Sequence, residues 1–146
     1  IYSSPANKFV AGFVGSPSMN FVQCTLQEYD NRLYVEGAGM KLQIPENRAD
    51  MFSTYRNREV ILGLRPEHIS ESNQETDSNH PSSFRAVIRL VEPLGSEQLV
   101  HLEVNNERMI ARIDPKLVIA PGEAMKCKAD MDAAIFFDAE NEQRIG

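Results

Sequence analysis

The sequence predicts a mainly β fold, built as a small barrel or a sandwich, with two short helices. Three observations predict it: apolar residues alternate with polar ones in short runs, turn-forming residues separate these runs, and one nearly unbroken apolar run lies between two β-rich halves. Alternation is typical of half-buried strands, and many short strands between turn signals are typical of barrels and sandwiches. Two β-rich halves around one central strand favour an OB-like barrel.

Length and composition indicate one domain, or one domain with an appendage, because 146 residues with 42% hydrophobic content can bury a real core. The net charge of −6 argues against a nucleic-acid-binding protein, and it gives no reason to expect an anionic membrane surface as partner. No run reaches the roughly 18 apolar residues of a membrane span, and no signal peptide is visible. Cys24 and Cys127 are interpreted as buried, reduced thiols, although a disulfide is possible.

The first predicted element is a short amphipathic helix over residues 5–14. Ser4 can cap it and Pro5 suits its first position, whereas Gly15 and then Pro17 end it. The chain begins without Met and runs straight into this helix, so we expect a piece of a longer protein whose missing part lies upstream. The helix has one apolar stripe, made of Phe9, Val10, Phe13 and Val14.

From residue 20 the hydrophobic period changes from that of a helix to two, which indicates strands. We predict strands over residues 22–26, 32–35 and 41–44, with a turn at Asp30-Asn31 and a loop or bulge at 37–39. These elements make up the first β-rich half.

Residues 47–55 carry Met51, Phe52 and Tyr55 at helical spacing. We therefore predict a short helix or turn there, and we expect this apolar group to cover the core as a lid.

The apolar run Val60–Leu64 is predicted to be the central strand, covered on both faces. Its β-branched residues, Gly63 and the following Pro66 favour a strand over a buried helix. Pro66 fixes its own φ and biases Arg65 towards extended geometry. The charged residues that follow the strand, at 65–68, are therefore expected to lie on a stiff backbone. We expect Arg65 to pair with Glu67 or with another nearby carboxylate.

The second β-rich half follows residues 70–83, which are polar and are predicted to form an exposed loop. Alternation then predicts strands that begin near Phe84, Val100, Met109, Met125 and Ala134. In the first of these strands the inward-facing residues are expected to be Phe84, Ala86, Ile88 and Leu90.

Known catalytic and metal-binding patterns are missing. The three histidines and two cysteines have no ligand spacing, no nucleophile–histidine–acid arrangement can be assembled, and no glycine-rich phosphate loop with its lysine is present. We therefore expect that this chain is not itself an enzyme and binds neither metal nor cofactor.

Four stretches resemble one family, the ATP-binding subunits of bacterial carbohydrate-importer ABC transporters of the maltose, glycerol-3-phosphate and multiple-sugar class. The first resembles the junction between the ATPase domain and a C-terminal regulatory domain of the TOBE/MOP-like, OB-like kind. The others resemble motifs of that regulatory domain, so the resemblance covers almost the whole chain. The stretches are the run from Ile1 to Phe21, Gly63-Leu64-Arg65-Pro66-Glu67-His68, Val91-Glu92-Pro93-Leu94-Gly95-Ser96-Glu97, and Phe136-Phe137-Asp138 followed by Arg144-Ile145.

The resemblance implies a division into a terminal helix and linker over residues 1–19 and a regulatory and dimerisation domain over residues 20–146. It implies that the parent protein hydrolyses ATP with Mg in its missing upstream domain to drive carbohydrate uptake. It also implies a homodimer through the β domain, membrane permease subunits as partners of the parent, and a possible cytosolic regulator. The location would be cytoplasmic, at the inner face of the cell membrane, without membrane insertion or nucleic-acid binding.

One departure from the family pattern concerns the last turn, where the family usually has glycine and this chain has Glu142; Asn141 is expected to take the left-handed position instead. The interface or regulatory residues that the resemblance implies lie around the junction, the strand exit and a later hairpin. They are Phe13, Gly15, Ser16, Pro17, Met19, Asn20, Gly63, Arg65, Pro66, Glu67, His68, Gly95 and Glu97.

Two other functions remain open. A small-ligand or oxyanion-binding β domain would need converging backbone N–H groups and lysines, for which Lys126 and Lys128 are the candidates, although a solvated face explains them as well. Oligonucleotide binding by an OB barrel would need a basic groove with exposed aromatic residues, against which the charge and the 8% aromatic content speak.

Overall fold

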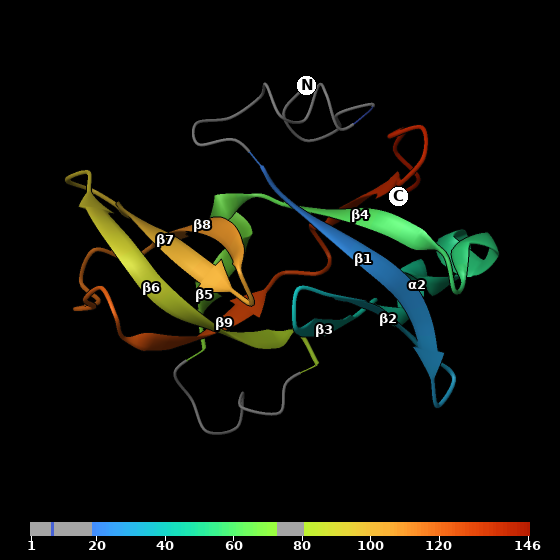
Figure 1. Cartoon of the computed structure of the whole chain (residues 1–146), viewed down its shortest axis with the longest axis horizontal. Helices are drawn as coiled ribbons and strands as arrows, with labels where there is room; N and C mark the ends of the chain where they lie inside the picture. The colour runs from blue at the N-terminus through green and yellow to red at the C-terminus, as the bar shows by residue number, and fades with distance from the viewer. Residues whose placement is uncertain (1–6, 8–18, 73–80) are drawn as a thin grey trace.

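The computed structural model describes residue 7 and residues 19–72 and 81–146, and these residues form two five-stranded antiparallel sheets. Figure 1 shows the first sheet and the helical segment at one end of the molecule and the second sheet at the other. The first sheet has the order β10-β4-β1-β2-β3 and the second β5-β9-β6-β7-β8. The elements are β1 (Asn20–Tyr29), β2 (Arg32–Gly37), β3 (Met40–Gln43), α2 (Glu46–Ala49), the 3-10 helix η1 (Asp50–Tyr55), β4 (Glu59–Leu64), the 3-10 turn η2 (Pro66–His68), β5 (Ile69–Glu71), β6 (Ser83–Pro93), β7 (Gln98–Val104), β8 (Glu107–Ile113), β9 (Ala124–Ala129) and β10 (Ile135–Asp138).

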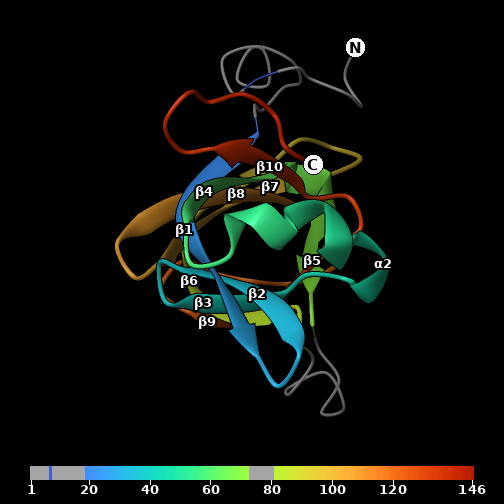
Figure 2. The same ribbon diagram turned by 90° about the vertical axis from the view of Figure 1, so that its right-hand side faces the viewer.

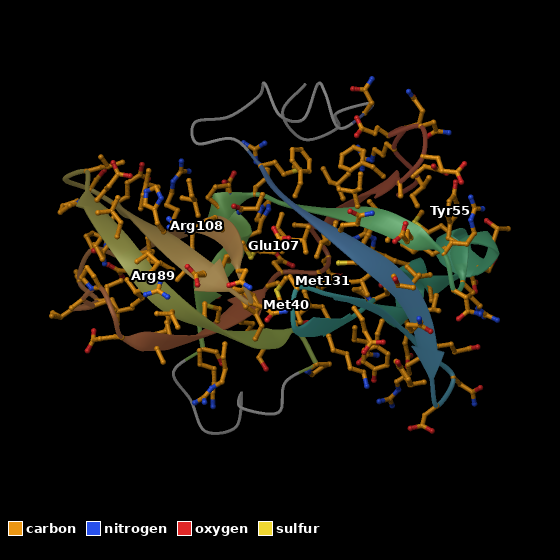
Figure 3. The ribbon with its side chains drawn as sticks, in the orientation of Figure 1. Met40, Tyr55, Arg89, Glu107, Arg108 and Met131 are labelled. Carbon is orange, nitrogen blue, oxygen red and sulfur yellow. The ribbon has the colours of Figure 1, made fainter. Side chains whose placement is uncertain are left out.

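One apolar cluster joins the inner faces of both sheets, so the two sheets share a core. Met40 of β3 and Met131, which follows β9, lie in the middle of the molecule and are almost fully buried (Figure 3). The mainly β fold that the alternation predicts is therefore confirmed, and so is the curled, barrel-like arrangement.

The central position predicted for the apolar run is confirmed by β4, which pairs with β1 on one side and with β10 on the other. Every residue of β4 after Glu59 is buried. The tight turn between β1 and β2 is confirmed as well, since Asp30 and Asn31 both have positive φ, as type I′ hairpins require.

The helical lid is confirmed as a segment, but one of its residues points the wrong way. Figure 2 shows α2 and η1 lying between the edges of the curled first sheet, where the Phe52 ring packs edge-on against Phe136 at 4.8 Å between centroids. Met51, predicted to cover the core, is 56% exposed. The reason is the 3-10 geometry: residues three apart share a face, so Phe52 and Tyr55 point the same way and Met51 does not.

The strict alternation predicted for β6 breaks at Arg89. The pairing with β7 shifts there, from Ile88 opposite Leu102 to Leu90 opposite His101. This irregularity inserts an extra residue and turns the following side chains to the other face. The prediction that Leu90 faces inward is therefore wrong, and Leu90 is 48% exposed.

The loop predicted over residues 70–83 is shorter than expected at both ends. Ser70 and Glu71 belong to β5, which pairs with β9, and Ser83 begins β6. Ser72 and Ser82 are buried, because backbone hydrogen bonds join both to β9: Ser72 N donates to Lys126 O and Ala129 N donates to Ser82 O. Residues 73–80 lie outside the described residues.

The N-terminal predictions also fall outside the described part of the chain. Of the helix predicted over residues 5–14 only Asn7 is described, where it forms an isolated bridge with Gln143, and the linker residues Phe13, Gly15, Ser16 and Pro17 are not described. No helix among the residues that are described is long and apolar enough to cross a membrane.

Cys24 and Cys127 are both buried and form no disulfide, as expected. Burial raises the pKa of each thiol to about 12, with a smaller contribution from Glu107 at Cys24 and from Glu71 at Cys127. Both thiols therefore stay protonated and unreactive at neutral pH.

The left-handed position in the last turn is taken by Glu142, at φ 60°, and not by Asn141. Asp138 Oδ1 accepts from the Asn141 N–H, and Asn141 Oδ1 accepts from the Gln143 N–H, which holds Asn141 in place and moves the reversal to the next residue. The prediction for Asn141 is therefore wrong. Glu142 has the backbone conformation that glycine adopts without strain.

The bulge predicts opposite results for two neighbouring apolar residues of β6. Ile88→Ala is expected to lower the free energy of unfolding by about 2–5 kcal/mol, because it empties a fully buried site. Leu90→Ala is expected to change it by at most about 0.5 kcal/mol. Urea denaturation of both variants checks this, and a large loss for Leu90→Ala would contradict the shifted register.

Candidate functional site

The exit of β4 forms a short, stiff turn. Arg65 is extended, at φ −75° and ψ 147°, as predicted from the following proline, and the buried Pro66 starts η2. The His68 N–H donates to Arg65 O at 2.9 Å and closes the turn. The side chains of residues 65–68 are thereby fixed at the place where the first sheet meets the second.

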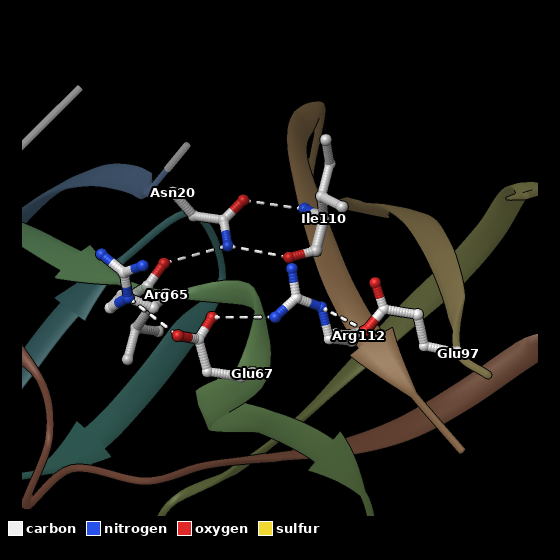
Figure 4. A network of polar contacts seen from close by, with 7 residues as sticks. Asn20, Arg65, Glu67, Glu97, Ile110 and Arg112 are labelled. Atoms are coloured by element: carbon white, nitrogen blue, oxygen red, sulfur yellow. Dashed lines mark hydrogen bonds and ion pairs between the residues drawn. The ribbon is translucent and has the colours of Figure 1, made fainter. Parts of the chain in front are cut away.

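Asn20 ties the two sheets together through its side-chain amide (Figure 4). Its Nδ2 donates to Leu64 O at 3.0 Å, at the end of β4, and to Ile110 O at 2.9 Å, in β8. Its Oδ1 accepts from the Ile110 N–H at 2.7 Å. One buried side chain therefore bonds to backbone groups of both sheets.

A chain of four charged groups runs beside Asn20 (Figure 4). Arg65 Nε donates to Glu67 Oε2 at 2.9 Å, and Glu67 Oε1 lies 3.9 Å from Arg112 Nη1. Arg112 Nε lies 3.1 Å from Glu97 Oε2. Positive and negative groups alternate along the chain, which confirms the expected pairing of Arg65 with Glu67 and extends it to the β6–β7 hairpin.

The Glu67 carboxyl has a pKa below its usual range. Burial alone would raise this pKa, but the hydrogen bond from Arg65, a backbone hydrogen bond, and the charges of Arg65 and His68 together outweigh it. Glu67 is therefore a carboxylate at neutral pH and accepts from Arg65 in its charged form.

Gly63 and Met19 form the apolar backing of this junction. They pack with Ile61, Ile135 and Phe137 on the face of β4 away from the main core. A Cβ on Gly63 would lie 2.5 Å from Met19 Sδ and 3.2 Å from Phe137 Cε2. Glycine is needed here for close packing, because the room that a side chain would take is already filled.

Gly95 shapes the hairpin that carries Glu97. Its φ is +80°, a left-handed conformation that glycine adopts without strain. The Leu94 N–H donates to Glu97 O at 2.8 Å and closes the turn, which places the Glu97 side chain within reach of Arg112.

The structure thus brings together four of the predicted residues, Asn20, Arg65, Glu67 and Glu97, in one polar network. His68 does not join this network; it lines a neighbouring hollow together with three arginines, of which Arg65 also belongs to the network. Sequence reasoning missed Arg112, which sits at an ordinary outward position of a strand, and no linear spacing connects it with Glu67 or Glu97. The described residues hold no group of His, Cys, Asp or Glu that could bind a metal ion. Chemically, the network is a joint that fixes two sheets.

Asn20→Ala is expected to lower the free energy of unfolding by about 1–3 kcal/mol, because it leaves the Ile110 N–H and two carbonyl groups without their partner. Gln23→Ala, at an exposed position of the same strand, serves as the matched control and is expected to have little effect. Urea denaturation measures the free energy of unfolding of both variants. Equally small losses would show that the Asn20 hydrogen bonds do not stabilise the contact between the two sheets.

Glu67→Gln is expected to lower the free energy of unfolding by on the order of 1 kcal/mol at neutral pH, since the pair is partly exposed. A depressed folded-state pKa stabilises the fold above the unfolded value of about 4.3, and this contribution is lost as pH falls through the folded value. The difference in the free energy of unfolding between wild type and variant should therefore be largest at pH 6–7 and shrink below about pH 4. Denaturation across pH checks this; Glu59→Gln is the control, and a pH-independent difference would refute the charged pairing.

Comparison with known proteins identifies the family. Residues 62–137 match the TOBE domain family, and residues 15–69 match the MalK OB fold domain. The oligosaccharides import ATP-binding protein MsmX of Bacillus subtilis is 38% identical over 99% of this chain and 39% of its own length. The multiple sugar-binding transport ATP-binding protein MsmK of Streptococcus mutans is 35% identical over 99% of this chain and 38% of its own length. The chain thus spans about two-fifths of the length of these relatives.

A solved structure agrees with the fold. The molybdate-bound form of the cytoplasmic molybdate-binding protein ModG superposes with a TM-score of 0.60 over 80% of this chain and 94% of that chain, at 13% identity. At this identity the likeness concerns the fold alone. Family membership rests on the family matches: the TOBE match covers more than half of the chain, so the chain belongs to the TOBE domain family, with a MalK-type OB fold in its first half.

Proposed function

We propose that this chain is the regulatory and dimerisation domain of the ATP-binding subunit of a sugar ABC importer. The observation that carries the proposal is the match along 99% of the chain to ATP-binding proteins for oligosaccharide and multiple-sugar import. These relatives are more than twice as long, and this sequence has no phosphate-binding glycine loop. ATP hydrolysis with Mg is accordingly assigned to another part of the parent protein.

The parent would act at the cytoplasmic face of the membrane, bound to the permease subunits of its transporter. Two copies of the ATP-binding subunit would have to separate and meet again in each cycle. A lasting contact between their regulatory domains keeps each encounter intramolecular and so raises the effective concentration of one ATPase domain near the other. The joint around Asn20 and Glu67 supports this role, because it makes the domain a stiff body that transmits the contact.

The surface proposed for that contact lies at the hairpin end of β6. Leu90 is 48% exposed because of the bulge, and Leu94 in the hairpin is 50% exposed. Exposed apolar side chains on an otherwise charged surface are suited to burial against a second copy. Arg89 and Glu103 form an ion pair beside them: Nε donates to Oε1 at 3.2 Å and Nη2 to Oε2 at 3.3 Å. Figure 3 shows Arg89 on this half of the molecule.

Light scattering of this chain across a dilution series is expected to show a dimer that persists at micromolar concentration. Leu90→Glu combined with Leu94→Glu is expected to weaken that dimer at least about a hundredfold, because like charges would face each other across the contact. Met51→Glu changes an equally exposed apolar residue at the other end of the molecule and is expected to leave the dimer intact.

A monomer at all concentrations would refute an autonomous dimerisation role for this chain. A dimer that both variants leave unchanged would refute the proposed surface but keep the dimerisation role.

A further inference from the structure

Three arginines from distant parts of the sequence line one hollow of about 240 Å³. Arg48 comes from α2, Arg65 from the exit of β4, and Arg144 from the C-terminal segment that bridges to Phe137 of β10. His68 and the segment 132–135 complete the lining. The fold therefore brings together like charges that the sequence keeps apart.

Arg48 is held in place before any ligand arrives. Its guanidinium lies over the rings of Phe52 and Phe136, at 5.8 and 5.6 Å from their centroids. Its Nη1 donates to Met131 O at 2.7 Å and to Asp132 O at 3.4 Å. A guanidinium fixed by stacking and by backbone carbonyls loses little freedom when it binds a ligand.

Electrostatics in the hollow are unfavourable as long as it holds no anion. Burial lowers the pKa of Arg48, the Asp132 carboxylate opposes this, and Arg144 lowers the pKa further. Among the described residues, neither Arg48 nor Arg144 forms an ion pair with a carboxylate. These two side chains therefore form no direct ion pair among the described residues, and the nearby Asp132 carboxylate offsets only part of their charge.

Two buried nitrogens at the same place have no hydrogen-bond partner among the described residues, Arg65 Nη1 and His68 Nδ1. A buried N–H without an acceptor costs free energy, and native proteins satisfy nearly all such groups. After a small shift of the side chains, an oxygen-rich ligand in the hollow would supply an acceptor for Arg65 Nη1 and, in the tautomer protonated at Nδ1, for His68.

We propose that this hollow binds phosphate, either as inorganic phosphate or as the phosphate group of a small monoester. Three guanidinium charges, minus the carboxylate charge of Asp132 and that of Glu67, which pairs with Arg65, leave one positive charge, so the hollow attracts an anion. The planar fork of arginine fits phosphate oxygens with two parallel hydrogen bonds. The volume lies below the roughly 300 Å³ at which pockets for drug-sized ligands begin, so it suits a small ligand. The inference stands apart from the sugar-importer assignment.

Thermal unfolding of this chain in increasing inorganic phosphate tests the site, with sodium chloride at the same ionic strength as reference. A ligand that binds the folded state raises the unfolding midpoint in a saturable way. We expect this rise with phosphate and not with chloride. A titration with a hexose monophosphate separates the two sources: tighter binding assigns the monoester, and equal or weaker binding assigns inorganic phosphate. Identical midpoints in phosphate and chloride would overturn the proposal.

Three substitutions locate the site. Arg144→Gln is expected to weaken phosphate binding by about tenfold or more, the usual effect of removing one charge-assisted hydrogen bond. Arg85→Gln removes the same charge from an exposed position of β6 and is expected to leave the affinity unchanged. Asp132→Asn removes the carboxylate from the hollow and is expected to tighten binding several-fold, a gain that misfolding cannot produce. Equal weakening by Arg85→Gln and Arg144→Gln, or no gain with Asp132→Asn, would overturn the assignment.

Discussion

The burial of β4 on both faces is the constraint on which the rest of the structure depends. The strand pairs with β1 and β10, and its residues after Glu59 contribute to both apolar clusters, so neither its register nor its direction can change without exposing apolar surface. Its last carbonyl, Leu64 O, is held by Asn20. Because the next residue is extended and the one after it is proline, the charged turn that follows has one possible course.

Polar groups rather than apolar ones fix the orientation of the second sheet at this turn. Hydrophobic contact is non-directional and would tolerate small rotations of one sheet against the other, whereas hydrogen bonds and bridged ion pairs do not. Partly exposed ion pairs contribute little free energy each. The main effect of Glu67, which lies between Arg65 and Arg112, is therefore to fix the position of the two arginines relative to each other. The apolar core therefore supplies most of the stability, and the polar network sets how the two sheets are oriented.

Local signals predicted the strands, the turns and the central position of β4, because alternation, paired turn residues and β-branched runs act within a few residues. Two kinds of effect escaped prediction: contacts between distant residues, and the detailed local geometry of a helix and a turn. Leu90 is exposed because a bulge shifts the pairing with β7, and Met51 because its helix is 3-10 and not α. Arg112 could not be found from sequence, since its partners Glu67 and Glu97 are far away along the chain. The positive φ of Glu142 follows from the hydrogen bonds that Asp138 and Asn141 make.

Arg65 connects the joint between the sheets with the cationic hollow. Its Nε is committed to Glu67, while its Nη1 is buried without an acceptor beside the hollow that His68 and Arg144 also line. An anion bound there would contact the same guanidinium that fixes the orientation of the second sheet. Two interactions that share one side chain are coupled, and the coupling is reciprocal: whatever tightens the joint also changes the affinity for the anion by the same factor. The placement of Arg65 thus gives the domain a direct physical route by which a small ligand can act on the contact between its sheets.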